Sequence, residues 1–169
     1  FKMEINKTEG HWIWMDFNEG WDEESQLKRF GDIWRKTESY KMKYLEGEYD
    51  VILCNFSIHY SKREEGCLIN LIEEITRRSK KGTLLKICFP NKDKLLRKLE
   101  EEEIIKLPSN SYVKYINNEF MEIYFPWTHK KSIIEPLLSS NELERILLNK
   151  GWELKEKKYI ESYLDWKEW

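Results

Sequence analysis

The sequence predicts an α/β fold whose sheet is mostly parallel and carries an antiparallel edge. Two continuous apolar runs, residues 49–56 and 83–89, are typical of strands that are covered on both faces. Between them, residues 68–75 place apolar side chains at three- and four-residue spacing, which predicts an amphipathic helix. Strand, helix and strand with short connections form a right-handed βαβ unit, the building block of parallel sheets.

A strand and a helix are expected before this unit. Residues 11–17 are mostly aromatic and apolar, and the turn-prone residues 18–20 follow, so we expect a strand that stops at Asp16. Apolar residues at helical spacing occur between residues 22 and 44. One helix is therefore expected there, with Gly47 in its end region.

The chain after residue 75 predicts further elements in alternation. The basic residues 77–81 and Gly82 are expected at the end of the central helix, since cations and glycine favour helix C-termini. Residues 92–103 predict a short charged helix. Residues 112–125 predict a β-hairpin that turns at Asn117 and Asn118.

The last part of the chain predicts one more helix and one more strand. Ser139 or Asn141 is expected to cap a helix that runs through Leu148 and ends at Gly151. Residues 152–163 predict a final, largely exposed strand. No Gly/Ser linker or low-complexity tract interrupts the chain, so no internal domain boundary is expected.

Composition excludes some classes of function. The 169 residues include 29 Lys+Arg against 31 Asp+Glu, a net charge of −2, so no global positive field draws the chain to nucleic acid. Any contact with RNA must therefore be local. No apolar run approaches the ~20 residues that span a bilayer, and no apolar signal segment begins the sequence. We expect an intracellular, cytoplasmic protein that does not contact membranes.

Candidate binding residues follow the predicted strands. Ligands of open α/β sheets bind beyond the C-terminal ends of the strands. The residues expected there include Asp16, Phe17, Asn55, Phe56, His59 and Tyr60. A carboxylate accepts hydrogen bonds from an exocyclic amine or a ribose, and an amide both donates and accepts. Histidine and tyrosine rings add aromatic faces, which suit a flat heterocycle.

The residues alone leave simpler explanations open. A His-Tyr pair after a strand is more often part of a packed or solvated loop, and Asp16 alone suits a turn or a helix N-cap. No Ser/His/Asp or Cys/His arrangement stands out, and His11, His59 and His129 show no metal-ligand spacing. No G-x-G occurs, although such a turn normally follows the first strand of a nucleotide-binding sheet.

Several motifs point to one family. Residues 49–61, YDVILCNFSIHYS, resemble the signature segment of the messenger-RNA cap guanine-N7 methyltransferases, whose pattern is roughly F-D-V-V-S-C-Q-F-A-L-H-Y. Residues 81–83 (KGT) are similar to the family's K-P-G-G before the next strand, and residues 89–91 (FPN) to its P-D/N after it. Residues 135–138 (EPLL) and 151–154 (GWEL) are similar to its E-Y-L-V and Y-G-L-E-L.

The resemblance implies a cofactor, S-adenosylmethionine. Asp16 and Phe17 match the family's acid and neighbour that hold the adenine of the cofactor. Asn55 matches a glutamine that contacts the cofactor, and Phe56 matches the residue between cofactor and cap. The resemblance implies no metal.

The resemblance also implies a substrate, the cap guanine. His59 and Tyr60 match residues around that guanine, and Glu135 matches the carboxylate that accepts hydrogen bonds from its N1–H and exocyclic amine. The implied reaction transfers a methyl group to guanine N7. This nitrogen has a free lone pair and the departing sulfur is cationic, so no general acid or base is needed, and catalysis rests on proximity and alignment. Without the resemblance, the residues predict instead that Glu135 is a solvated carboxylate at the end of a helix.

The implied fold is the Rossmann-like class I methyltransferase sheet. Residues 1–169 would be a partial methyltransferase domain, the C-terminal two-thirds of the catalytic fold, with the first βα units expected before Trp12. The implied partners are the 5′ end of capped mRNA and fused or associated guanylyltransferase or triphosphatase domains or a stimulatory subunit. Such fusions suggest a viral protein, placed in a viral factory or virion, while the nucleus stays open.

Two other functions are weighed beside this one. The missing glycine-rich half favours a non-catalytic, methyltransferase-like subunit that stabilises or stimulates a partner in a capping complex. A class I methyltransferase with another small or nucleic-acid substrate is the third reading. Binding of S-adenosylmethionine separates the first two functions, and competition by cap analogue separates the third.

Overall fold

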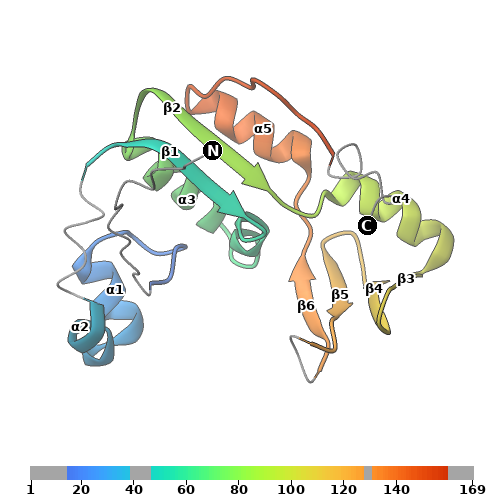
Figure 1. Ribbon diagram of the computed structural model, residues 1–169. Helices are drawn as coiled ribbons and strands as arrows, with labels where there is room; N and C mark the ends of the chain where they lie inside the picture. The colour runs from blue at the N-terminus through green and yellow to red at the C-terminus, as the bar shows by residue number, and fades with distance from the viewer. Residues whose placement is uncertain (1–14, 39–46, 128–130, 160–169) are drawn as a thin grey trace, which may run out of the picture.

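A computed structural model describes residues 15–38, 47–127 and 131–159, and it is a mixed α/β structure whose described strands form two sheets (Figure 1). The elements in chain order are α1 (Glu23–Phe30), α2 (Asp32–Glu38), β1 (Tyr49–Asn55), the 3-10 helix η2 (Ile58–Lys62), α3 (Cys67–Arg77), β2 (Ser79–Cys88), α4 (Lys92–Glu102), β3 (Ile104–Leu107), β4 (Ser111–Tyr115), β5 (Phe120–Tyr124), β6 (Ile133–Pro136) and α5 (Ser140–Asn149). Strands β1 and β2 form a parallel pair, and β3 to β6 form an antiparallel sheet in that order.

The predicted βαβ unit is confirmed as β1, α3 and β2. The buried side chains of α3 are Leu68, Leu71, Ile72 and Ile75, the spacing that the sequence shows. They pack with Ile52 of β1 and Leu85 of β2 into one apolar core, to which α5 adds Leu143. Strand β2 begins at Ser79, earlier than predicted, because α3 already ends at Arg77.

The other face of the parallel pair is open to solvent. Val51 and Leu53 are 52% and 62% exposed, and Leu84 is also exposed. Helices α3 and α5 both contribute to the core on the opposite face. The expectation that these strands are covered on both faces is therefore wrong for the described residues.

The antiparallel sheet is larger than the predicted hairpin. The hairpin of β4 and β5 is confirmed, and the Asn117 side chain closes its turn by accepting from the backbone N–H groups of Glu119 and Phe120. Strands β3 and β6 flank it and were not predicted. Among the strands in the described ranges only β1 and β2 pair in parallel, so the expected mostly parallel sheet does not describe these strands. One face of this sheet packs against α4, with Leu99 at the centre of the second core.

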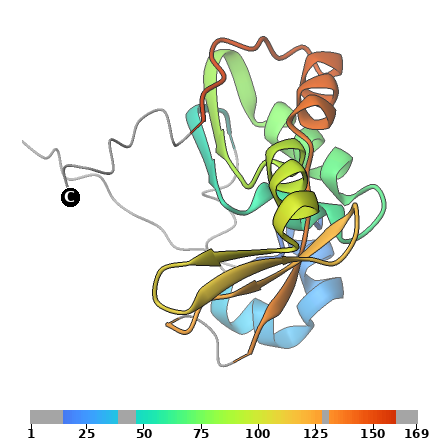
Figure 2. The ribbon, with the colours of Figure 1, turned by 90° about the vertical axis from the view of Figure 1, so that its right-hand side faces the viewer.

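The two sheets meet where β6 leads into α5. Strand β6 contacts η2, the segment that follows β1. Asn91 and Leu138 form an isolated parallel bridge, and the backbone N–H of Lys92 donates to the carbonyl of Leu138 at 3.0 Å. Figure 2 shows the antiparallel sheet at one end of the molecule and the parallel pair at the other.

The single helix expected over residues 22–44 is two helices. Asp22 caps α1 by accepting from the Ser25 backbone N–H, but Gly31 interrupts the helical path with φ 64° and ψ −157°. Residues 39–46 lie outside the described part of the chain, as does most of the strand expected over residues 11–17. Met15 and Asp16, its last residues, are not in a strand.

Replacing Gly31 with alanine is expected to destabilise the protein by roughly 1–3 kcal/mol, because only glycine adopts this backbone region without strain. A Cβ at this position meets no atom within 4 Å, so strain alone carries the effect. Chemical denaturation of the two proteins measures the difference. An alanine variant as stable as the parent would contradict this account.

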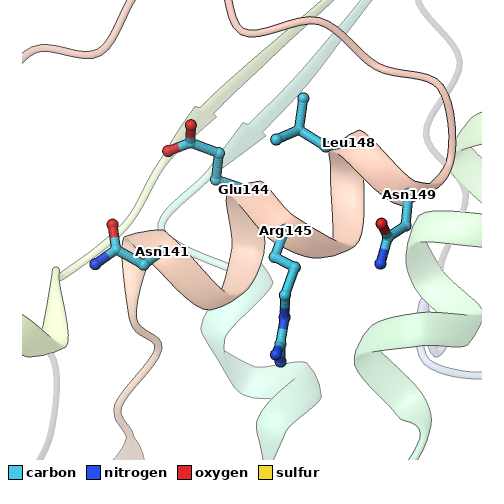
Figure 3. A pocket seen from close by; sticks show the side chains of 5 residues that line it. All are labelled: Asn141, Glu144, Arg145, Leu148 and Asn149. Atoms are coloured by element: carbon cyan, nitrogen blue, oxygen red, sulfur yellow. The ribbon is translucent and has the colours of Figure 1, made fainter.

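The final helix is confirmed and the final strand is not. Ser139 caps α5 by accepting from the Asn141 backbone N–H. The described residues after Gly151 form no strand; instead, the Lys157 ammonium lies 3.3 Å from Glu144 on α5. A surface hollow of about 320 Å³ lies on this helix and is lined by Asn141, Glu144, Arg145, Leu148 and Asn149. Figure 3 shows these five side chains projecting from α5. None of these was predicted as a site residue.

Within residues 15–38, 47–127 and 131–159, no helix has both the length and the apolar character that crossing a bilayer requires.

Candidate functional site

Three predicted site residues meet where the two sheets join. His59 and Tyr60 lie on η2, and Glu135 lies on β6, 75 or more positions along the chain. His59 Nε2 lies 3.1 Å from Glu135 Oε2, and the Tyr60 hydroxyl donates to Glu135 Oε1. The two rings lie with their centroids 4.4 Å apart. The arrangement is a carboxylate held between an imidazole and a phenol.

Local structure explains how these side chains reach one point. Ile58 is fully buried and anchors η2 directly after β1, which turns His59 and Tyr60 towards β6. On β6, Glu135 lies opposite Met121 of β5 and shares its buried face of the sheet. Glu135 is only 7% exposed, so the solvated helix-end position considered for it is wrong.

The surroundings keep Glu135 ionised. Burial alone would raise the pKa of this carboxyl, but the hydrogen bonds from His59 and Tyr60, with the positive charge of Arg63, hold the pKa below its ordinary value. Arg63 lies 5.2 Å from the centre of the Tyr60 ring and donates to the Ile134 carbonyl. The site therefore holds a buried negative charge next to the hydroxyl of Tyr60, whose ring also lies beside the Arg63 cation.

One ring nitrogen of His59 has no hydrogen-bond partner among the described residues. The side chain is 1% exposed, and this nitrogen is Nδ1. Because Nε2 faces an ionised carboxylate, Nε2 carries the proton and Nδ1 presents a lone pair when the ring is neutral. Such an atom is able to accept a hydrogen bond from a bound molecule.

Tyr60 makes the stability of the protein sensitive to alkaline pH. Burial, followed by the hydrogen bond to Glu135 and its charge, raises the pKa of Tyr60 from 10.0 to about 12. A raised pKa stabilises the folded state below pH 10, and this contribution is lost as the pH rises from about 10 through 12. Because phenylalanine does not titrate, we expect the free energy of unfolding of the Tyr60→Phe variant to fall less steeply than that of the parent between about pH 10 and 12. Urea titrations at several pH values check this, and parallel pH profiles for both proteins would refute it.

The two predicted adenine-binding residues lie in a tight turn. Asp16 Oδ1 accepts from the Asn18 backbone N–H at 3.0 Å, and Oδ2 lies 3.2 Å from Arg29 Nε. Phe17 packs against the core of the parallel unit. Asp16 is thus engaged as a turn residue, the simpler explanation for this position.

Gln26 is a residue that the sequence did not single out. It is fully buried, and its amide bonds to both the N–H and the carbonyl of Asp16 and to the carbonyl of Gly20. Asn18, in the turn that Gln26 fixes, accepts from the Ser61 hydroxyl at 2.6 Å. Gln26 therefore positions a loop that is tied directly to η2. The sequence feature that could have identified this residue is a glutamine at a position on the apolar face of a predicted helix.

Asn55 and Phe56 lie at the C-terminal end of β1 and are exposed. The Asn55 side chain has no hydrogen-bond partner among the described residues. Phe56 is 55% exposed and has φ 50°, a left-handed conformation that costs a bulky residue roughly 1–2 kcal/mol. Its backbone N–H donates to the Cys88 carbonyl at 2.7 Å, which holds it there. Residues in strained backbone conformations cluster at active sites and ligand-binding sites, and the positive φ of Phe56 makes it a candidate for such a role.

Comparison with known proteins identifies no family: no family model matches the chain, and no curated protein matches it. The roles of the site residues therefore rest on their geometry and on the sequence motifs described above.

Proposed function

We propose that this chain is the cap-recognising part of a messenger-RNA guanine-N7 methyltransferase. One observation supports it most: the His-Tyr doublet and the distant Glu135, linked only by motif resemblance, lie within hydrogen-bond distance of each other. The sequence patterns of η2 and β6, taken separately, do not predict this contact, whereas the motif resemblance does. The proposal includes the Rossmann-like methyltransferase fold, to which β1, α3 and β2 would contribute the described parallel strands.

The chemistry of Glu135 suits the edge of a guanine. Guanine presents N1–H and an exocyclic amine side by side, and an ionised carboxylate accepts both hydrogen bonds. In the structure both carboxylate oxygens are engaged by His59 and Tyr60, so a guanine has to share or replace these contacts. Tyr60, at the more exposed side of the cluster, is the group we expect to move.

The residues proposed for S-adenosylmethionine fit it in part. Asn55 and Phe56 are exposed at a strand end, where an amide and an aromatic ring are able to contact a nucleoside. Asp16 fits less well, because Asn18 and Arg29 already occupy its carboxylate oxygens. We therefore assign cofactor contacts in this chain to Asn55 and Phe56.

In the proposed mechanism the protein only aligns guanine N7 with the methyl group of the cofactor. The cofactor supplies a methyl group on a cationic sulfur, which leaves readily. Glu135 would fix the guanine edge, and Tyr60 and Phe56 would hold the ring so that N7 faces the methyl group and water is excluded. No side chain needs to take or give a proton.

A methyl-transfer assay tests the proposal. RNA with an unmethylated guanosine cap is incubated with the protein and radiolabelled S-adenosylmethionine, then digested to nucleosides. We expect label in 7-methylguanosine and inhibition by guanosine cap analogue. Label in another nucleoside, without inhibition by cap analogue, would favour a class I methyltransferase with a different substrate.

A second function, a non-catalytic subunit of a capping complex, has its own supporting observations. His59, Tyr60 and Glu135 satisfy one another, which is how a structural brace between two sheets is built. Asp16 is also fully engaged. Calorimetry with S-adenosylmethionine separates the two functions: binding supports the enzyme, and no binding together with stimulation of a partner methyltransferase supports the subunit.

A further inference from the structure

The antiparallel sheet has one face that its helix does not cover. Side chains alternate along each strand, so the face opposite α4 carries two rows of neighbours. One row runs across three strands as Lys106, Tyr112 and Tyr124. The adjacent row is Ile104, Lys114, Glu122 and Ile134. We call these seven residues the open face.

Aromatic rings lie at the centre of the open face. The Tyr112 and Tyr124 rings lie 5.5 Å apart and are tilted by 31°. The Tyr112 hydroxyl donates to Glu122 at 2.8 Å, which fixes the ring on the sheet surface. Both tyrosines are half-buried, so one side of the ring pair remains accessible.

Positive charge and a hollow accompany these rings. Lys106 is the cross-strand neighbour of Tyr112, and Lys114 is the neighbour of Glu122. Both lysines line a hollow of about 520 Å³ that also includes Tyr112 and Ser111. Glu122 stays ionised and offsets one of the two ammonium groups, so the open face keeps one net positive charge on a chain of net negative charge.

We propose that the open face binds a short single-stranded segment of nucleic acid. A base would stack on the tyrosine pair, since every base offers a flat π-face, and the adjoining phosphates would lie against Lys106 and Lys114. A protein partner fits less well, because the exposed isoleucines Ile104 and Ile134 lie at opposite edges of the face rather than as one apolar patch. This inference does not depend on the proposed cap chemistry, whose residues lie on η2 and on the other face of the sheet.

Fluorescence anisotropy with an uncapped, end-labelled ten-nucleotide oligouridine tests this inference. We expect Tyr112→Ala to weaken binding at least about fivefold through lost stacking. We expect the double variant K106E/K114E to weaken it further and to reduce the salt dependence of binding by about two released counterions. The double variant changes only exposed charges, so its folding, checked by circular dichroism, is expected to be intact.

Matched controls decide the outcome. The double variant K81E/K86E makes the same charge change on exposed positions of β2 in the other sheet, and it should bind like the parent. Tighter binding of oligouridine than of oligothymidine assigns RNA as the ligand, and the reverse assigns single-stranded DNA. No binding by the parent at low salt, equal losses in K81E/K86E and K106E/K114E, or equal competition by inorganic polyphosphate and oligouridine would each overturn the proposal.

Discussion

Alanine in place of Glu135 is expected to abolish most cap methylation while leaving binding of S-adenosylmethionine nearly unchanged. The substitution removes the acceptor for both guanine donors, and a hydrogen bond to a charged group contributes about 1.5–3 kcal/mol. Each lost bond should therefore reduce kcat/KM roughly 10- to 100-fold. Steady-state kinetics on capped RNA, with calorimetry for the cofactor, measures the two effects.

A second substitution separates recognition from stability. Alanine also strips His59 and Tyr60 of their common partner, so part of its effect will be loss of folded protein. Glu135→Gln keeps the volume and most of the internal contacts, but its amide group would face the guanine donors with a donor of its own. We expect near-parental stability with strongly reduced methylation, whereas Glu101→Gln, an exposed change on α4, should leave both unchanged. Full turnover by Glu135→Gln would remove Glu135 from the cap site.

Gln26→Ala is expected to produce a large loss of stability for a polar side chain outside the site. The side chain is fully buried and makes three hydrogen bonds with the backbone of the Asp16 turn. Each bond contributes about 1 kcal/mol, so the free energy of unfolding should fall by roughly 3 kcal/mol before any cavity effect. Urea denaturation measures this change. Asn70→Ala, an exposed amide on α3, is the control and should have little effect.

The same variant tests how the turn is connected to η2. If the Asp16 turn loosens, the bond between Asn18 and Ser61 weakens next to His59 and Tyr60. Amide hydrogen exchange should then increase in residues 16–20 and in η2. Exchange confined to the turn would show that η2 is held by Ile58 and Glu135 alone.

The sequence predicted those elements whose apolar pattern is strong. The spacing of Leu68, Leu71, Ile72 and Ile75 is that of a helix with one buried face, and α3 has it. The turn chemistry of Asn117 identified the hairpin. Strands β3 and β6 are four residues each, too short for alternation to distinguish them from loops. Their formation depends on pairing with β4 and β5, which is a tertiary effect.

Failures of prediction have local causes. Gly31 lies within a helical pattern, where glycine is often tolerated, and the sequence does not show that its backbone adopts a positive φ. The two apolar runs of β1 and β2 were interpreted as covered on both faces, yet Val51 and Leu53 are exposed because both packing helices share one side. The sequence pattern of a strand shows which of its residues are apolar, but it does not show whether other elements cover one face of the strand or both.

The candidate site was partly visible in the sequence. The doublet His59-Tyr60 and Glu135 were named from motif resemblance, and the structure brings them together, although their roles stay predictions. Gln26 and the Asn18–Ser61 bond were not foreseen, because hydrogen bonds to backbone groups of a distant turn leave no periodic signal. Asp16 was named, but its engagement with Arg29 depends on how α1 folds back on the turn.

The bond between Tyr60 and Glu135 spans 75 positions of the chain. Contacts between such distant positions form late in folding, since the entropy of closing a long loop must first be overcome. A nascent or partly unfolded chain would therefore have its parallel unit before it has the imidazole–carboxylate–phenol cluster. Any molecule that binds this cluster recognises only the fully assembled protein, and by binding it would slow the unfolding of the whole chain.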